Sequence, residues 1–325
     1  MKACVLHAIG DLRCENVPDP KRKQGEVLIK IRASGICGSD ISRVFTKGTY
    51  HFPTIPGHEF SGEIIEADDF ALIGMKCAVF PILPCCNCIN CTSENYAQCE
   101  NYNYFGSRCD GGFAELICVP KWNVVIASDS LSYEEIAMTE PCAVALHALE
   151  QSNLKAGSRV CIYGAGPIGI MIAKWAQLKG AVDITLVDID RNKIIFAQSL
   201  GFNTEPYGSY DIVIEGTGVS SGFENAVSSV KTFGTLVLMG NPISEMSLSQ
   251  KSYWEVLRKE LTLKGTWNSI YGQNYNEWRT VLLFMDKLNL QPLISHRFEL
   301  HECNIAFDMM NQRKEFYNKV MFMIN

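Results

Sequence analysis

Short apolar runs alternate with helix-like segments over the second half of the chain, and this alternation constrains the fold most strongly. The apolar runs, from residue 159 on, are RVCIYG, ITLVD, YDIVIEGTG and TLVLMG, and the segments between them are PIGIMIAKWAQLKG, NKIIFAQSLG and GFENAVSSVKTFG. Near-continuous apolar strands between amphipathic helices are typical of a parallel sheet covered on both faces. We therefore predict a doubly wound α/β domain here.

The first of these strands leads into a glycine-rich turn that opens a helix. Gly164, Gly166 and Gly169 form the pattern G-x-G-x-x-G, with Pro167 and Ile168 inside it. We expect the first glycine to permit the tight turn, the second to let a pyrophosphate approach, and the third to let helix and strand pack closely. The pattern predicts a dinucleotide site, and a glycine turn without a ligand is the alternative.

An acidic residue at the end of the next strand favours NAD. Asp188 follows the run ITLV, nineteen residues after Gly169, where a carboxylate can accept hydrogen bonds from both ribose hydroxyls. The same carboxylate would repel a 2'-phosphate, so we predict NAD rather than NADP. Arg191 and Lys193 lie close by as further candidate cofactor contacts, and they keep NADP open as an alternative.

Before residue 148 the pattern is different. Short runs rich in Val, Ile and Cys are broken by Gly, Pro and Asn, as in VLIKIRASG, FSGEIIEA, KCAVFPILP and FAELICVP. Such runs predict a β-rich domain, and a length of 325 residues also favours two domains over one. A last helix is predicted over residues 276–288, where Trp278, Val281, Leu282 and Met285 recur at helical spacing.

Composition narrows the classes of function. The chain is 47% hydrophobic and 20% charged, which excludes a disordered protein, and its net charge is -6 without a long basic run. We therefore expect a small-molecule partner and neither a nucleic acid nor a membrane. The N-terminus lacks the apolar region of a signal peptide, and no stretch reaches transmembrane length, so the expected location is the cytosol.

Five of the fourteen cysteines fall within fifteen residues. Cys85, Cys88, Cys91 and Cys99 have the spacing C-x2-C-x2-C-x7-C, and four thiolates can close a tetrahedral shell with no open position. We predict a structural zinc that holds a long loop without a core of its own. Ordinary buried cysteines and an iron-sulfur cluster are the alternatives, and Cys86 is given no role.

A second set of candidate ligands has a mixed composition. Cys37 lies in SGICGSD, and His58 and Glu59 lie in PGHEFSG. A thiolate, an imidazole and a carboxylate suit a zinc with three protein ligands and one open position. Taken singly, each residue is more often structural, since His58 can be a hydrogen-bonded histidine and Cys37 a small buried side chain.

Several motifs occur in the order typical of the zinc-containing medium-chain dehydrogenases, which the chain resembles over nearly its whole length. They are CGSD, GHE, the four-cysteine loop, DGGFAE at 110–115, EP at 140–141 and GAGPIG. The resemblance implies a split GroES-like, β-rich catalytic domain at residues 1–147 and 272–325, and a Rossmann domain at residues 148–271. It also implies one catalytic and one structural zinc per chain.

The resemblance also points to one branch of this family. Glu140 stands where simple alcohol dehydrogenases have a cysteine ligand and sorbitol dehydrogenase-like members have glutamate. By resemblance, Cys37, His58 and either or both of Glu59 and Glu140 hold the catalytic metal. The implied activity is NAD-dependent oxidation of a polyol or polyol phosphate. Segments after residue 201 are shorter than is usual in the family.

The same resemblance assigns further roles near Cys37. Ser39 matches the hydroxyl that takes the alcohol proton, while Ser42 stands where a relay histidine is often found. Arg43 and Lys47 follow in the same loop, and we expect them to contact a substrate phosphate if there is one. Together with Cys37 and Ser39 they form the expected substrate site, and solvated surface charge is the alternative for both.

Three points stay open at this level. Family members form dimers or tetramers, and the strand ELTLKG could form such a contact. A plain polyol, threonine or butanediol could be the substrate instead. A zinc-stabilised protein that binds NAD without turning it over is an alternative outside enzymes.

Overall fold

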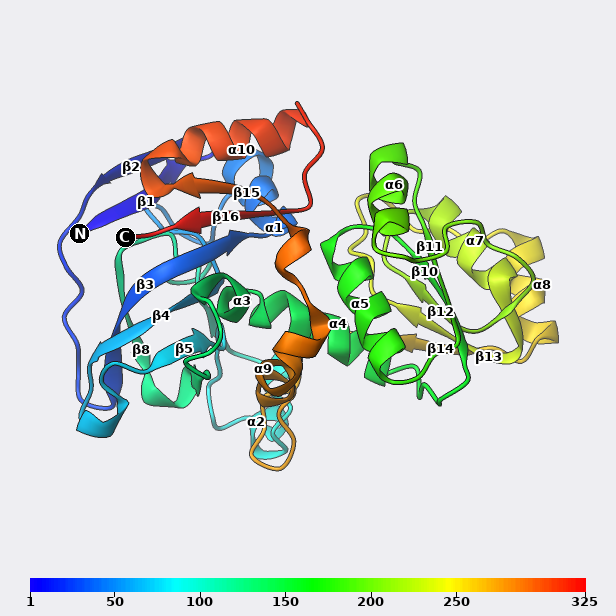
Figure 1. Cartoon of the computed structure of the whole chain (residues 1–325), viewed down its shortest axis with the longest axis horizontal. Helices are drawn as coiled ribbons and strands as arrows, with labels where there is room; N and C mark the ends of the chain where they lie inside the picture. The colour runs from blue at the N-terminus through cyan, green and yellow to red at the C-terminus, as the bar shows by residue number, and fades with distance from the viewer. The chain divides into compact units, whose positions relative to one another are not determined.

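A computed structural model describes residues 1–325 and divides them into two units (Figure 1). Unit 1 comprises Met1–Pro141 and Ile270–Asn325, and unit 2 comprises Cys142–Ser269. The boundary falls inside helix α4 (Thr139–Glu150). None of the helices combines the length and the apolar character needed to cross a membrane.

Unit 1 is built on a mixed sheet of seven strands, most of them antiparallel. In spatial order these are β15 (Ile294–Glu299), β16 (Lys319–Met323), β3 (Glu26–Ile36), β4 (Glu59–Glu66), β5 (Lys76–Val79) and β9 (Val124–Ile126), with β8 (Leu116–Pro120) also paired to β3. Two small sheets accompany it, β1 (Lys2–Ala8) with β2 (Asp11–Asn16) and β6 (Ile82–Leu83) with β7 (Asn103–Tyr104). The predicted β-rich domain is therefore confirmed.

The helices of unit 1 range from 4 to 12 residues in length. They are α1 (Gly38–Ser42), which continues as a π-helix at Arg43–Lys47, α2 (Ile89–Thr92), α3 (Tyr133–Ala137), α9 (Glu277–Leu288) and α10 (Cys303–Gln312). The predicted last helix is confirmed as α9, and the Asn276 side chain caps it by accepting from Arg279 N–H. The core includes three packed aromatic rings, those of Phe113, Phe307 and Phe322.

Unit 2 holds the predicted parallel sheet. Its strands are β11 (Asp183–Val187), β10 (Arg159–Tyr163), β12 (Tyr210–Glu215), β13 (Val230–Leu238) and β14 (Thr262–Gly265), in that spatial order and all parallel. The connecting helices are α5 (Pro167–Leu178), α6 (Arg191–Ser199), α7 (Ser220–Ser229) and α8 (Gln250–Arg258). Figure 1 shows α5 and α6 on one face of the sheet and α7 and α8 on the other, so the doubly wound α/β prediction is confirmed.

The sheet of unit 2 has five strands, one fewer than the six of the usual doubly wound order. Beyond β11, the place of a further strand is taken by a single parallel bridge between Thr185 and Asn203, with Asn203 O accepting from Leu186 N–H at 2.9 Å. The short segment after residue 201, noted in the sequence, therefore corresponds to a reduced edge of this sheet. Chain order reverses between β10 and β12, and ligands of such sheets bind at the carboxyl ends of strands at this switch.

Candidate active site

The ends of two neighbouring strands bring the mixed set of candidate ligands together. β3 and β4 are antiparallel, with Gly35 opposite Glu59, so the residue after β3 and the residue before β4 lie at the same edge. There the ligand atoms of Cys37, His58 and Glu59 all lie within 4.8 Å of one another. A buried imidazole and carboxylate beside a half-buried thiol fit a three-ligand zinc site. The sequence predicted this juxtaposition only as a hypothesis.

Asp40 lies in α1, which directly follows Cys37, and contacts this cluster. No role for it was predicted from the sequence. Its fully buried carboxylate accepts from Cys37 N–H at 3.0 Å and from Arg43 Nη1 at 2.7 Å, and lies 3.4 Å from His58 Nδ1. Burial raises the pKa of Asp40, but the charges of His58 and Arg43 and the hydrogen bonds outweigh it and hold the pKa at about 2. A carboxylate behind a metal-binding histidine fixes the orientation of its ring.

Lys319 is a second residue that sequence reasoning missed. It begins β16, which pairs with β3 on the side opposite β4, so it reaches the same strand end. Its buried ammonium forms a short ion pair with Glu59 and donates to Ile36 O at 3.3 Å. Burial lowers the pKa of Lys319, but the charge of Glu59 outweighs this and raises it overall. Only the pairing of β16 with β3 reveals this neighbour, and the local sequence carries no signal for it.

The ion pair between Lys319 and Glu59 requires a glycine on the strand between them. A Cβ on Gly35 would lie 2.4 Å from Glu59 Oε2 and 2.8 Å from Lys319 Cε. Any side chain at this position would therefore displace one partner of the pair.

Glu140 lies next to the cluster but outside the trio of mutually close ligand atoms. Burial and the nearby charge of Glu59 raise the pKa of Glu140 to about 7, against the opposing charges of His58 and Lys319. Tyr104 Oη donates to Glu140 Oε1 at 3.4 Å, and the Tyr104 ring lies 5.5 Å from that of His58. Tyr104 is a third residue absent from the sequence hypothesis, since an isolated tyrosine at the end of the two-residue strand β7 has no distinguishing pattern.

The helix after Cys37 places the remaining candidates. Arg43 Nη1 donates to Ser39 Oγ at 2.9 Å as well as to Asp40, so this arginine is engaged with the residues around His58. Ser42 Oγ donates to the Ser39 carbonyl at 2.8 Å. Lys47, at the end of the π-helix, is exposed. In this helical segment Arg43 is therefore hydrogen-bonded to its neighbours, whereas Lys47 lies at the surface.

The four-cysteine loop forms a separate cluster in unit 1. The four sulfurs lie within 4.8 Å of one another. Tetrahedral zinc with Zn–S bonds of about 2.3 Å separates its sulfurs by roughly 3.8 Å. The corresponding separations are 3.5 Å for Cys88–Cys91, 3.5 Å for Cys85–Cys99, 3.9 Å for Cys85–Cys91 and 4.0 Å for Cys88–Cys99. These residues fit a closed tetrahedral site.

Backbone N–H groups of the same loop stabilise two of its thiolates, those of Cys85 and Cys88, whereas burial and the neighbouring sulfurs raise the pKa of Cys91 to about 12. N–H groups of Glu100 and Cys91 hydrogen-bond to the sulfur of Cys88 and lower its pKa to about 6. Cys85 N–H also donates to Cys99 Sγ at 3.3 Å. Cys86 is exposed, with its sulfur 3.5 Å from Pro84 O, and does not join the cluster.

The glycine-rich turn of unit 2 has the geometry of an anion-binding loop. Gly164 has a φ of +109°, a conformation that favours glycine. A Cβ on Gly169 would lie 1.9 Å from Gly164 O, whereas one on Gly166 would meet only open space. Gly166 caps α5, whose first turn contains Pro167 and Ile168, and free N–H groups at a helix start attract phosphate.

Asp188 directly follows β11 and is tied to this turn. One of its oxygens accepts from Ala165 N–H at 2.9 Å, and the other accepts from Asp190 N–H at 2.9 Å. Lys193, in α6, lies 3.5 Å from the same carboxylate, while Arg191 begins that helix. The carboxylate therefore sits beside the predicted pyrophosphate loop, with one lysine close to it.

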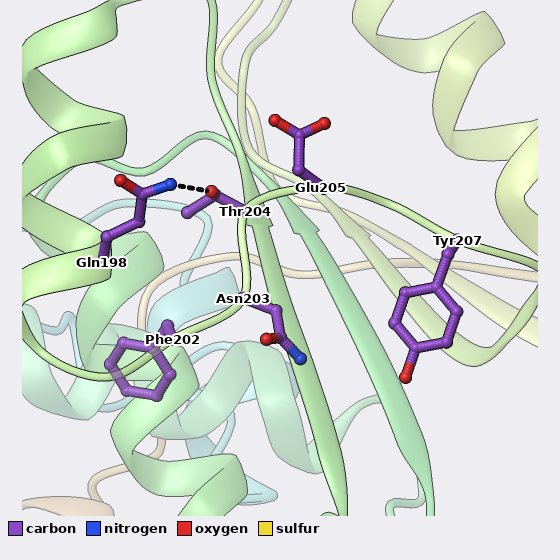
Figure 2. Close-up of a pocket in the computed structure, with 6 residues that line it drawn as sticks. All are labelled: Gln198, Phe202, Asn203, Thr204, Glu205 and Tyr207. Atoms are coloured by element: carbon purple, nitrogen blue, oxygen red, sulfur yellow. Dashed lines mark hydrogen bonds between the residues drawn. The ribbon is translucent and has the colours of Figure 1, made fainter.

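A surface pocket in unit 2 lies elsewhere (Figure 2). Its lining residues are Gln198, Phe202, Asn203, Thr204, Glu205 and Tyr207. Figure 2 shows the amide of Gln198 hydrogen-bonded to Thr204, at 2.7 Å. The pocket lies at the reduced sheet edge and contains none of the predicted site residues.

Comparisons with known proteins identify the family. Residues 23–129 match the alcohol dehydrogenase GroES-like domain, and residues 167–287 match the zinc-binding dehydrogenase domain. The galactitol 1-phosphate 5-dehydrogenase of Escherichia coli K12 is 36% identical over 321 residues, which cover 91% of this chain and 92% of that protein. A crystal structure of galactitol-1-phosphate dehydrogenase from Escherichia coli has a TM-score of 0.91 at 34% identity, covering 99% of this chain and 100% of that one.

Other relatives carry different names. The L-threonine 3-dehydrogenase of Yersinia enterocolitica is 29% identical, over 95% of this chain and 97% of that protein. A putative zinc-binding dehydrogenase from Sinorhizobium meliloti, solved with NADP, is 27% identical with a TM-score of 0.90, covering 99% of this chain and 98% of that one. The matches confirm the GroES-like and Rossmann folds predicted from the sequence. The chain therefore belongs to the zinc-binding, medium-chain alcohol dehydrogenase family and is a dehydrogenase of alcohols or polyols.

Proposed function

We propose that this enzyme oxidises a secondary alcohol of a polyol phosphate, of the galactitol 1-phosphate type, with NAD as hydride acceptor. The observation that carries this proposal is the near full-length similarity to galactitol 1-phosphate 5-dehydrogenase. Residues 1–147 and 272–325 would form the catalytic domain and residues 148–271 the NAD-binding domain. All fourteen cysteines are unpaired, which agrees with a reducing cytosol as the working compartment.

The zinc ligands follow from the two clusters. We assign Cys37, His58 and Glu59 to the catalytic zinc because their ligand atoms converge. Glu140 would be the alternative carboxylate, since it lies beside Glu59 and is buried. The four cysteines of the loop would hold the structural zinc, whose closed sulfur shell leaves no room for substrate.

When bound, zinc supplies the Lewis acidity that lowers the pKa of the substrate hydroxyl, and NAD supplies the hydride acceptor. Ser39 would take the proton of that hydroxyl while its own hydroxyl proton passes to a cofactor ribose hydroxyl or to water. The Ser39 oxygen already accepts from Arg43, which orients the serine and leaves one lone pair for the substrate. Ser42 directs its hydroxyl to the Ser39 carbonyl, so it does not extend the relay from the Ser39 hydroxyl.

Asp188 would select NAD over NADP through its charge. Asp188→Asn removes the negative charge in a side chain of the same size and keeps one hydrogen-bond acceptor. We expect the kcat/KM ratio of NAD to NADP to fall by roughly tenfold, because the 2'-phosphate is no longer repelled. An unchanged ratio in steady-state assays would remove Asp188 from cofactor selection. Lys193→Gln is the matched variant, and we expect it to weaken NADP rather than NAD.

We expect Arg43 and Lys47, at the two ends of the π-helix, to differ in their effect on a substrate phosphate. Arg43 is bound to Ser39 and Asp40, so its removal should impair phosphorylated and plain polyols alike. Lys47 is exposed at the end of the π-helix and is therefore our candidate for a phosphate-specific contact. Lys47→Gln should raise KM several-fold for a polyol phosphate alone. An equal change for sorbitol would exclude this contact.

The deciding experiment follows NADH formation at 340 nm over a panel of substrates. The panel contains galactitol 1-phosphate, galactitol, sorbitol, 2,3-butanediol and L-threonine, and each is measured with and without a zinc chelator. We expect chelator-sensitive turnover, with the highest kcat/KM for the polyol phosphate. Preference for a plain polyol, butanediol or threonine would overturn the substrate assignment while keeping the enzyme class.

The edge strand of unit 2 is the candidate contact between subunits. All four residues of β14 are exposed, and the strand is paired only with β13. An open edge of this kind can pair with a second copy. We propose a dimer or tetramer built through β14, which light scattering on the wild type and on a Leu263→Lys variant would test.

A further inference from the structure

Three cysteines outside both candidate zinc sites lie together in unit 1. Cys4 in β1 is directly opposite Cys14 in β2, and Cys303 starts α10, which contacts β2 (Figure 1). We call these three residues the hairpin thiol cluster. Cys4 and Cys303 are fully buried, whereas Cys14 is half-buried. The cluster therefore has one thiol that solvent can reach and a buried thiol facing it.

The strand register places Cys4 and Cys14 at a spacing suited to a disulfide. Cys4 N–H donates to Phe113 O at 2.8 Å, and Leu6 N–H donates to Thr54 O at 2.8 Å. The backbone groups at these positions therefore point away from β2, which makes Cys4 and Cys14 a non-hydrogen-bonded pair. Such pairs have Cα atoms about 4.5 Å apart, with side chains close together, and disulfides accept Cα separations of roughly 4.4–6.8 Å.

The two thiols of this pair have different chemical character. The neighbouring Cys4 thiol lowers the pKa of Cys14 to about 7 despite partial burial, and Lys2 and His301 contribute through their charges. The pKa of Cys4 is raised well above its usual value by its contacts with Cys14 and Cys303 and by burial. Cys4 has a single thiol hydrogen, which Leu300 O, at 3.2 Å, or the Cys14 thiolate can accept. Cys14 is the only one of the three thiols that solvent reaches, so it is the one that peroxide meets first, and Cys4 is its buried neighbour across the hairpin.

We propose that Cys14 is a site of oxidation by hydrogen peroxide, and that Cys4 then closes a reversible disulfide with it across the hairpin. In the first step the Cys14 thiolate attacks one peroxide oxygen, the O–O bond breaks and hydroxide leaves, which gives Cys14 sulfenic acid. In the second step Cys4 sulfur attacks the Cys14 sulfur. The S–O bond breaks, the Cys4 thiol proton joins the departing hydroxide, and water leaves. Sulfur is oxidised and peroxide is reduced, and a dithiol such as dithiothreitol reverses the bond.

Cys118 offers a matched comparison within the same unit. It is also half-buried, on β8, but burial raises its pKa, with Glu26 and Glu66 adding to the rise. At neutral pH a thiol of pKa about 7 is half ionised, whereas one above 9 is ionised to about 1% or less. After allowing for the lower nucleophilicity of the more acidic thiolate, Cys14 should react roughly five to ten times faster.

The experiment treats the zinc-loaded, full-length enzyme with limiting hydrogen peroxide at pH 7. Free thiols are blocked with N-ethylmaleimide after timed intervals, and the chain is digested without reductant for mass spectrometry. We expect a linked pair of peptides containing Cys4 and Cys14, which dithiothreitol separates. The Cys14→Ser variant should show no link to Cys4, and the Cys118→Ser variant should form the link at the wild-type rate.

Other outcomes would overturn the proposal. These are a bridge from Cys14 to Cys303, sulfinic acid at Cys14 without any bridge, or oxidation of Cys14 no faster than that of Cys118. Neither Cys14 nor Cys118 belongs to the candidate zinc, substrate or NAD residues. The peptide readout is therefore independent of catalysis, and failure of the polyol assay would leave it intact.

Discussion

The four-cysteine loop and the Cys37 cluster are both candidate zinc sites of unit 1, yet they are assembled differently. The loop takes all four sulfurs from fifteen consecutive residues, and its own backbone N–H groups stabilise the thiolates of Cys85 and Cys88. The Cys37 cluster takes its ligands from the ends of β3 and β4, and side chains from α1, β7, α4 and β16 surround it. The first site is local in sequence, and the second depends on the register of three strands.

This difference shows how a metal site acquires reactivity. A site made of four sulfurs from one loop has a closed ligand shell, so it can stabilise the loop but offers no position for a substrate. The Cys37 cluster instead has Asp40, Lys319, Glu140 and Tyr104 around it, which are the kinds of groups that tune a metal ligand from outside. Four substitutions would test whether the two sites differ in this way.

The largest expected effect comes from Cys37→Ala. Removing the thiolate should release the catalytic zinc and reduce kcat/KM by about a thousandfold or more, or about 4 kcal/mol, because the Lewis acid is lost. Metal analysis should find about one zinc per chain in place of about two, with the four-cysteine site still loaded. Full zinc content together with full activity would show that Cys37 is not a ligand.

Lys319→Met should have the next largest effect. In the presence of a zinc chelator it leaves Glu59 buried without a positive partner, which should lower the free energy of unfolding by about 3 kcal/mol in urea denaturation. The double variant with Glu59→Gln should recover part of that loss, because no uncompensated charge remains. Strictly additive losses would mean that the two residues do not interact.

Cys88→Ser should lower stability less than Lys319→Met does, and it should also remove the zinc of the four-cysteine loop. The loop has little core of its own, so losing its zinc should open it locally and cost about 2 kcal/mol of global stability. Amide hydrogen exchange should accelerate over residues 85–99 and not in the Rossmann domain. Cys86→Ser is the matched control, since its sulfur lies outside the cluster, and it should retain wild-type zinc and exchange rates.

Tyr104→Phe should have the smallest effect. It removes a 3.4 Å hydrogen bond to Glu140, which we expect to change kcat by two- to tenfold, or about 1 kcal/mol. Cofactor KM should stay unchanged because the NAD loop belongs to unit 2. A larger effect on cofactor binding than on turnover would contradict the placement of Tyr104 beside the metal cluster.

The same contrast explains what the sequence could predict. The parallel sheet, the glycine turn, α9 and the clustering of four cysteines all follow from patterns within short windows, and the structure contains each of them. Lys319 and Tyr104 could not be found in this way, because their relevance depends on which strand lies beside β3 and where the short β7 ends. Arg43 was predicted as a phosphate contact, and its hydrogen bonds to Ser39 and Asp40 became visible only in three dimensions.

Gly35 limits which positions near the candidate zinc site can be varied when the enzyme is engineered. A side chain at this position would clash with both the Glu59 carboxylate of one strand and the Lys319 side chain of another. A library that randomises the substrate pocket should therefore leave this codon fixed. Even an alanine there would displace the Glu59 carboxylate or the lysine, so that a loss of specificity could not be told apart from a loss of the zinc environment.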